Sequence, residues 1–180
     1  IKKLDYLILS HGDYVHMGEA SYLVENFKVE KVILNKGEYN DLESKLIKML
    51  EQKRIPYYQN IKMLNIRNLK LYFLNNEIYD NENDNSIVLY TKINQQKLLF
   101  MGDAGKEVEE DIIKKYDLED IDILKVGHHG SNTSSSEEFI NSINPKNCLI
   151  SVGKNNRYGH PKQSVLDTLN DCNIYRTDQH

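Results

Sequence analysis

The fold of this protein is set by the stretch Leu4-Asp5-Tyr6-Leu7-Ile8-Leu9-Ser10-His11-Gly12-Asp13-Tyr14-Val15-His16-Met17-Gly18. Its first part belongs to an apolar run, Ile1–Leu9, which predicts a buried strand. Three potential metal ligands then follow within six positions, and they are His11, Asp13 and His16. A strand that runs into a loop of His and Asp, followed by a glycine and a helix, can place imidazoles and a carboxylate around a cation. Val15 stands in the middle of this loop and carries no donor atom.

Composition bounds the class of protein. The 180 residues are 39% hydrophobic and 28% charged, which predicts one soluble domain with a buried core. The net charge of -4 gives no broad basic surface for nucleic acid, so such a substrate would have to be held locally or by a metal. No apolar run approaches the ~20 residues that span a membrane.

Outward from the first loop, predicted strands and helices alternate, with one antiparallel insertion. The predicted helices are Gly18–Phe27, a helix capped by Asn40 or Asp41 and stopped at Arg54-Ile55-Pro56, Lys106–Tyr116, a helix with a capping box of Ser134 and Glu137, and a last helix from Pro161. The predicted strands are Lys31–Asn35, Lys70–Leu74, Ile87–Ile93, Lys97–Met101, Ile121–Val126, Cys148–Val152 and Ile174–Thr177. This order predicts a single domain over residues 1–180, of α/β or mixed layered architecture.

The two cysteines, Cys148 and Cys172, lack the spacing of a zinc knuckle. A disulfide between them and a pair of separate buried thiols are both compatible with the sequence. We favour two buried thiols.

Four strand ends carry side chains suited to metal chemistry. These are His11, Asp13 and His16; Asp103; His128 and His129; and His160 with its neighbour Tyr158. Taken singly, Asp103 could cap a helix and His129 could pack against Ser131. As a set they predict a metal site, because imidazole nitrogen and carboxylate oxygen suit zinc, manganese or iron. Two cations about 3.5–4 Å apart can activate a water molecule and hold a phosphodiester.

The loop His11–Gly18 resembles the His-x-His/Asp-x-Asp-His loop of the metallo-β-lactamase fold. The later motifs narrow the resemblance, because they occur in the order found in the hydrolase domain of ComEC-type DNA-uptake proteins. These motifs are Asn85–Leu89, Leu99–Gly105, Leu124–Ser131 and Tyr158–Pro161. The resemblance implies an αββα sandwich that is a fragment of a larger protein. We expect it to lack outer strands at both ends and to self-associate through exposed sheet edges.

The resemblance also implies roles for individual residues. His11 and Asp13 would hold one divalent ion, zinc or manganese, and His16 the second, with Asp103 bridging the two. His128 would be the further ligand. The catalytic set would be Asp13, Asp103, Lys125 and His160, with the last two on the phosphate side. The residues expected around the substrate or behind the ligands are His129, Ser131, Asn85, Ser86 and Tyr158.

Two departures from the family pattern bear on activity. Val15 occupies the position of an Asp ligand, so we expect one bound metal rather than two. Asn85 and Ser86 stand where many members of the fold have another metal-binding His.

The implied function is hydrolysis of a phosphodiester, with incoming DNA as the substrate. The domain would be attached to a membrane DNA-uptake channel and would face outward from the cell. One alternative is a non-catalytic module that binds nucleic acid or a partner, or acts as a scaffold. Another is a hydrolase of a small phosphodiester such as phosphocholine or a cyclic nucleotide.

Overall fold

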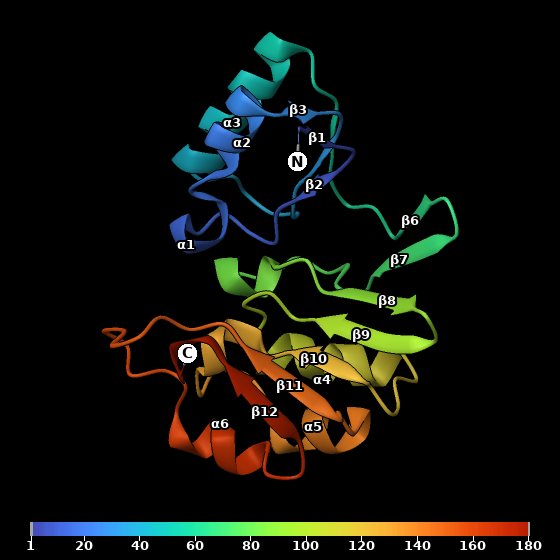
Figure 1. Cartoon of the computed structure of the whole chain (residues 1–180), viewed down its shortest axis with the longest axis vertical. Helices are drawn as coiled ribbons and strands as arrows, with labels where there is room; N and C mark the ends of the chain where they lie inside the picture. Colours follow the sequence, from blue (N-terminus) through green and yellow to red (C-terminus); the bar gives the residue numbers. More distant parts are fainter. Residues whose placement is uncertain (1, 180) are drawn as a thin grey trace.

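A computed structural model describes residues 2–179 and has four layers, with two facing sheets covered on their outer sides by helices (Figure 1). The N-terminal half contains β1 (Lys3–Leu4), β2 (Leu7–Ile8), α1 (Tyr14–Met17), α2 (Ala20–Asn26), β3 (Lys28–Val29), β4 (Val32–Ile33), α3 (Asp41–Lys53) and β5 (Tyr57–Tyr58). The C-terminal half contains β6 (Met63–Ile66), β7 (Leu69–Phe73), η1 (Glu82–Asn85), β8 (Leu89–Ile93), β9 (Gln96–Phe100), α4 (Lys106–Lys115), β10 (Ile123–Lys125), η2 (Gly127–Gly130), α5 (Glu137–Ile143), β11 (Asn147–Ile150), α6 (Gln163–Thr168), β12 (Asn173–Arg176) and η3 (Thr177–Gln179). No helix in the described range is long and apolar enough to cross a membrane.

The larger sheet has seven strands in the order β12-β11-β10-β9-β8-β7-β6. Strands β9 to β12 are parallel, whereas β6 to β9 form an antiparallel meander. In the N-terminal half, β2-β4-β5 form a parallel sheet and β1 pairs with β3. Because β9 and β10 are parallel neighbours, the loops that leave their carboxyl ends lie at the same edge of the sheet.

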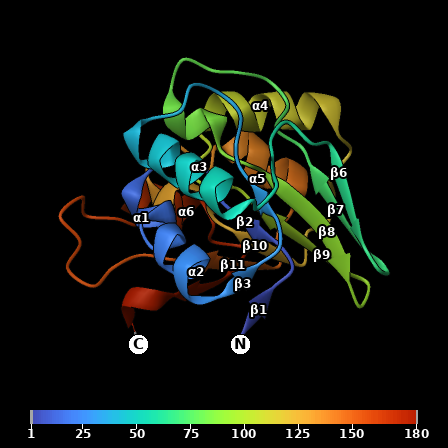
Figure 2. The same cartoon turned by 90° about the horizontal axis from the view of Figure 1, so that it is seen from above.

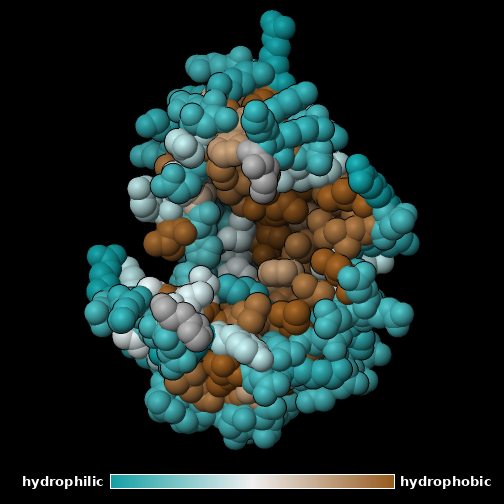
Figure 3. All heavy atoms as spheres, viewed as in Figure 1, coloured by the Kyte–Doolittle hydropathy of each residue, from teal (hydrophilic) through white to brown (hydrophobic). Residues whose placement is uncertain are grey.

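Three apolar clusters hold the layers together. Leu34 and Leu46 belong to the cluster between the smaller sheet and helices α2 and α3. Leu99 and Phe139 belong to the cluster between the larger sheet and helices α4 to α6. Between the sheets, Phe73 lies in a smaller cluster whose other members are largely half-buried. Figure 3 shows hydrophobic side chains gathered in the hollow between the two halves of the molecule.

The α3 helix illustrates how local sequence sets an element. Asn40 accepts hydrogen bonds from the backbone N–H groups of Leu42 and Glu43, and the Glu43 carboxylate accepts from the Asn40 backbone. This capping box confirms the predicted start of the helix. Arg54, in a left-handed conformation, ends it where the sequence predicts.

Three local predictions are corrected. The expected strand Ile1–Leu9 is two short strands, β1 and β2, separated by a bend at Asp5, and Ile1 lies outside the described residues. The capping box of Ser134 and Glu137 is wrong. Ser136 caps α5 by accepting from the Phe139 N–H, while the buried Ser134 hydroxyl donates to the Gly127 carbonyl.

The prediction of two separate thiols is wrong as well, because Cys148 and Cys172 form a disulfide. Cys148 lies on β11 opposite Ile174 of β12. Cys172 precedes Ile174 by two residues, and its Cα is 6.1 Å from the Cα of Cys148, which is within bridging distance. The pairing depends on the register of two strands. The hairpin of β8 and β9, by contrast, has a two-residue turn at Asn94-Gln95, since Ile93 pairs with Gln96.

Candidate metal centre

His11, His16 and Asp103 meet at the carboxyl edge of the sheets. His11 follows β2, His16 lies on α1, and Asp103 follows β9. His16 Nε2 is 3.1 Å from Asp103 Oδ1, and His11 Nε2 is 3.7 Å from Asp103 Oδ2. One potential ligand atom from each of the three residues lies within 4.8 Å of the others. This spacing and donor chemistry fit a divalent cation.

The buried His11 ring is held in a fixed orientation. Its Nδ1 is 3.2 Å from the Ser10 hydroxyl and 3.2 Å from the Ser86 hydroxyl. Its Nε2 faces Asp103 and, among the atoms of residues 2–179, has no hydrogen-bond partner. A buried nitrogen without a partner is costly unless a ligand satisfies it, so the His11 environment fits a metal.

The electrostatics favour the ligating forms of these groups. Burial, with a smaller effect of His16, lowers the pKa of His11 to about 4, so this imidazole is neutral at pH 7. Burial acts to raise the pKa of Asp103, but contacts with His16, His129 and His11 outweigh it and hold the pKa below its ordinary value. A neutral imidazole and an ionised carboxylate are the forms that bind a metal.

The histidine pair of η2 reaches the same centre from the end of β10. Both residues have a left-handed backbone, with φ of 45° at His128 and 55° at His129. His129 Nε2 is 3.2 Å from His16 Nε2 and 3.6 Å from Asp103 Oδ2, while its Nδ1 donates to the Ser151 carbonyl at 2.7 Å. His128 Nε2 is 3.9 Å from Asp103 Oδ2. The structure therefore brings His129, expected behind the ligands, at least as close to the centre as His128.

An open cleft of about 410 Å³ lies over this centre. Its lining comprises Asp13, Tyr14, Val15, Asn83, Asp103, His128, His129, Arg157, Tyr158 and His160. Asp13 is exposed at the rim, with Oδ2 3.9 Å from His11 Nε2. The His160 ring stacks on Tyr158 at 5.7 Å and meets His128 edge-on at 6.0 Å. The predicted residues Asp13, Tyr158 and His160 thus share one cleft with Asp103 of the centre.

Other predicted residues lie behind the centre. The buried Ser86 hydroxyl accepts from the Asp103 N–H at 3.0 Å, and so supports both Asp103 and His11. The Asn85 side chain accepts from the Tyr79 N–H and donates to the Tyr79 carbonyl, with both hydrogen bonds 2.9 Å long. Ser131 accepts from the Thr133 hydroxyl, which is 3.1 Å from His128 Nδ1.

Lys125 lies apart from this cleft. Its ammonium group donates to the Val126 carbonyl, and it lines a different cleft together with Ser151 and Tyr175. Burial lowers its pKa, while Asp103 acts in the opposite direction.

The sequence interpretation missed Tyr14 and Arg157, which line the cleft. Tyr14 is 74% exposed, and the Arg157 guanidinium lies 4.7 Å from the centre of the Tyr158 ring. Both residues adjoin predicted site residues in the sequence. An exposed aromatic residue within a ligand-bearing loop was the signal that could have indicated a substrate contact.

The comparisons identify the family. The model of the metallo-beta-lactamase superfamily matches residues 1–154. The chain belongs to this superfamily. Proteins of known structure share the fold of this chain: a mutant of the CmlA beta-hydroxylase matches with a TM-score of 0.61 at 10% identity, covering 98% of this chain and 43% of that one. The fold protein YhfI from Bacillus subtilis matches with a TM-score of 0.58 at 11% identity, covering 97% and 75%. The predicted αββα fold is confirmed.

The sequence relatives of this metallo-β-lactamase domain confirm the resemblance to competence proteins. ComE operon protein 3 of Bacillus subtilis (strain 168) is 37% identical over 99% of this chain and 24% of its own length. Recombination protein 2 of Haemophilus influenzae is 29% identical over 92% of this chain and 20% of its own. Competence protein ComA of Neisseria gonorrhoeae is 36% identical over 54% of this chain and 14% of its own. The chain thus spans about a quarter or less of the length of these relatives. It is a domain of a metallo-hydrolase family, and the fold implies a divalent metal.

Proposed function

We propose that this domain is a metal-dependent phosphodiesterase that cleaves DNA. The observation that carries the proposal is the convergence of His11, His16 and Asp103 within 4.8 Å, with Asp103 lining an open cleft. His129 adds a fourth donor, because its Nδ1–H is bonded to a carbonyl and leaves Nε2 free to bind a metal. With nitrogen and oxygen donors, zinc and manganese are the metals of choice.

A divalent ion at these residues would activate a water molecule and polarise a phosphoryl oxygen. The residues of the chain set the geometry around it. Ser86 orients His11 and supports Asp103. His128 and His160 line the cleft side by side, where an imidazole N–H can donate to a phosphate oxygen. Asp13, exposed at the rim, can accept the proton of the attacking water.

We propose a single bound ion. Val15 is 73% exposed at the cleft, and an isopropyl group cannot coordinate a second one. Phosphodiester cleavage by one metal is expected to be slower than by two. The same substitution supports the alternative of a non-catalytic module, as does the engagement of the Asn85 side chain by the Tyr79 backbone.

The rim of the cleft favours an unpaired DNA strand. Tyr14 is 74% exposed, so its ring is open to stacking by a base, whereas Tyr158, 58% exposed with its ring stacked on His160, contributes the exposed part of its side chain to the same rim. Arg157, against the Tyr158 ring, can bind a phosphate of the same strand. A small phosphodiester would leave most of these groups unused. Because relatives include a competence protein, we propose that the DNA is incoming DNA and that the domain belongs to an outward-facing part of a membrane uptake protein.

The test combines metal content with cleavage. We expect about one zinc or manganese ion per chain by elemental analysis, and cleavage of single-stranded DNA in preference to duplex. Asp103→Asn and His16→Ala should each abolish cleavage and lower the metal content. Asp171→Asn, at an exposed position outside the cleft, should change neither.

Tyr158→Ala should weaken cleavage of single-stranded DNA while leaving the metal content unchanged. Chains that retain no metal would favour the non-catalytic alternative, whereas cleavage that survives Asp103→Asn would overturn the assignment of the reaction to this centre.

A further inference from the structure

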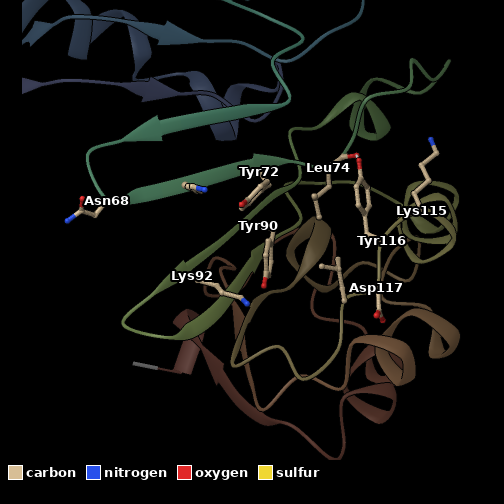
Figure 4. A pocket seen from close by; sticks show the side chains of 10 residues that line it. Asn68, Tyr72, Leu74, Tyr90, Lys92, Lys115, Tyr116 and Asp117 are labelled. Carbon is tan, nitrogen blue, oxygen red and sulfur yellow. The ribbon is translucent and has the colours of Figure 1, made fainter.

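A second cleft, of about 540 Å³, opens on the helix-covered side of the larger sheet, where the meander extends past the end of α4 (Figure 4). Its lining comprises Asn68, Lys70, Tyr72, Leu74, Tyr90, Lys92, Lys115, Tyr116, Asp117 and Leu118. It shares no lining residue with the cleft over the metal centre. Figure 2 shows the β6–β9 meander on the side of the molecule away from α1. We refer to this second cleft as the tyrosine cleft.

Two tyrosines form the floor of the tyrosine cleft. Tyr72 of β7 is directly opposite Tyr90 of β8 in the strand register, and their ring centres are 6.1 Å apart at an angle of 40°. Tyr72 is 37% exposed, and Figure 4 shows the two side chains next to each other on the sheet. Aromatic side chains in such an open, neighbouring arrangement provide a surface on which flat rings stack.

Two lysines lie beside the tyrosines. Lys70 precedes Tyr72 by two residues and Lys92 follows Tyr90 by two, so strand alternation puts all four side chains on one face. Both lysines are exposed, and neither forms an ion pair with any part of the chain between residues 2 and 179. Their charges are free to bind an anion.

The opposite wall of the tyrosine cleft carries little negative charge that could offset the two lysines. Lys115 is paired with Glu77 at 2.7 Å, and Figure 4 shows its side chain extending away from the tyrosines. The Tyr116 hydroxyl donates to the Leu74 carbonyl, which fixes that wall. Asp117 is the one acidic residue of the lining. The tyrosine cleft is therefore locally positive on a chain whose net charge is -4.

We propose that the tyrosine cleft binds a nucleotide unit, with the base stacked on Tyr72 and Tyr90 and the phosphate held by Lys70 and Lys92. Stacking surfaces flanked by cations are the means by which proteins hold single-stranded nucleic acid. An apolar peptide would leave the two free ammonium groups without an anionic partner. The volume lies within the usual range for small-molecule sites, about 300–1,000 Å³. This site needs no metal, so it stands apart from the function proposed above.

The test is a binding titration of a fluorescent ten-residue oligothymidylate in the presence of EDTA, which prevents metal-dependent cleavage. Tyr72→Ala should weaken binding roughly tenfold, the usual effect of losing one stacked base. The matched control is Tyr58→Ala, since Tyr58 is exposed on β5 outside both clefts. Binding by this control should equal that of the parent chain.

Charge is tested separately. The double variant Lys70→Gln/Lys92→Gln should reduce the magnitude of the slope of log K against log salt by about 0.7, because the two lysines hold one phosphate and each phosphate neutralised on a single strand contributes about 0.7. Lys45→Gln/Lys48→Gln, on the exposed side of α3, should leave the slope unchanged. This arm is informative even if Tyr72→Ala disturbs the sheet.

Competition by thymidine monophosphate would assign the tyrosine cleft to free nucleotides, and its failure to compete would assign it to a nucleic acid strand. The proposal is overturned if neither variant differs from its control, or if only Tyr158→Ala weakens binding, because the oligonucleotide would then occupy the cleft over the metal centre. If the parent chain binds the oligonucleotide but does not cleave DNA when metal is supplied, the result counts against the proposed phosphodiesterase and leaves the tyrosine cleft standing.

Discussion

Asp103→Asn should remove the stabilisation that a bound metal gives to this protein. The Asp103 carboxylate is buried, 3.1 Å from His16 Nε2 and between 3.6 and 3.9 Å from a ring nitrogen of His11, His128 and His129. It is the one carboxylate in the group of three central ligands. The amide of Asn preserves the shape of the side chain but removes the negative charge.

The magnitude follows from linkage between metal binding and folding. A metal ion at a free concentration of about a hundred times its Kd stabilises the native chain by about 2.7 kcal/mol. For a domain of this size, about 2–4 °C per kcal/mol converts this to a rise in Tm of roughly 5–11 °C. If loss of the carboxylate weakens metal binding about a hundredfold, the stabilisation falls to about 0.4 kcal/mol and the rise to roughly 1–2 °C.

The assay is thermal unfolding followed by circular dichroism, in EDTA and in manganese or zinc, for the parent chain and each variant. The shift is compared within each variant, so a change in metal-free stability does not affect it. Asp171→Asn, an exposed change of the same chemistry, should keep the full shift. A full shift in Asp103→Asn, or none in the parent chain, would refute the assignment of the metal centre.

Three further predictions follow from particular features. Cys148→Ala/Cys172→Ala opens a loop with a sequence separation of 24, which should cost about 3.5 kcal/mol and lower the Tm by roughly 7–14 °C in a melting experiment; an unchanged Tm would contradict it. Val15→Asp should raise the metal content from one ion toward two by elemental analysis. Because Val15 is 73% exposed, its metal-free unfolding free energy should stay within about 0.5 kcal/mol of the parent, and an unaltered metal ratio would argue against the site geometry. Edge strands β6 and β12 each pair with one neighbour in the described sheet, so sedimentation should detect concentration-dependent association; a monomer at high concentration would exclude it.

The sequence by itself predicted the fold and the grouping of His11, His16 and Asp103. Strand-then-loop patterns placed His11, His16 and Asp103 at carboxyl ends of strands, and parallel strands bring such ends to one edge. The α3 helix was equally readable, since Asn40 and Glu43 make a cap within four residues of chain. These features depend on local periodicity and on spacing along the chain, both of which are visible in sequence.

Tertiary structure alone decided the features that depend on which strands are neighbours and how their residues align. The Cys148–Cys172 disulfide and the Tyr72–Tyr90 pair both arise from strand register, which local sequence does not specify. The close approach of His129 to His16 depends on the left-handed backbone of the η2 turn. A side chain's distance from a site is set by such turns and registers, because a shift of one residue along a strand reverses the face on which it lies.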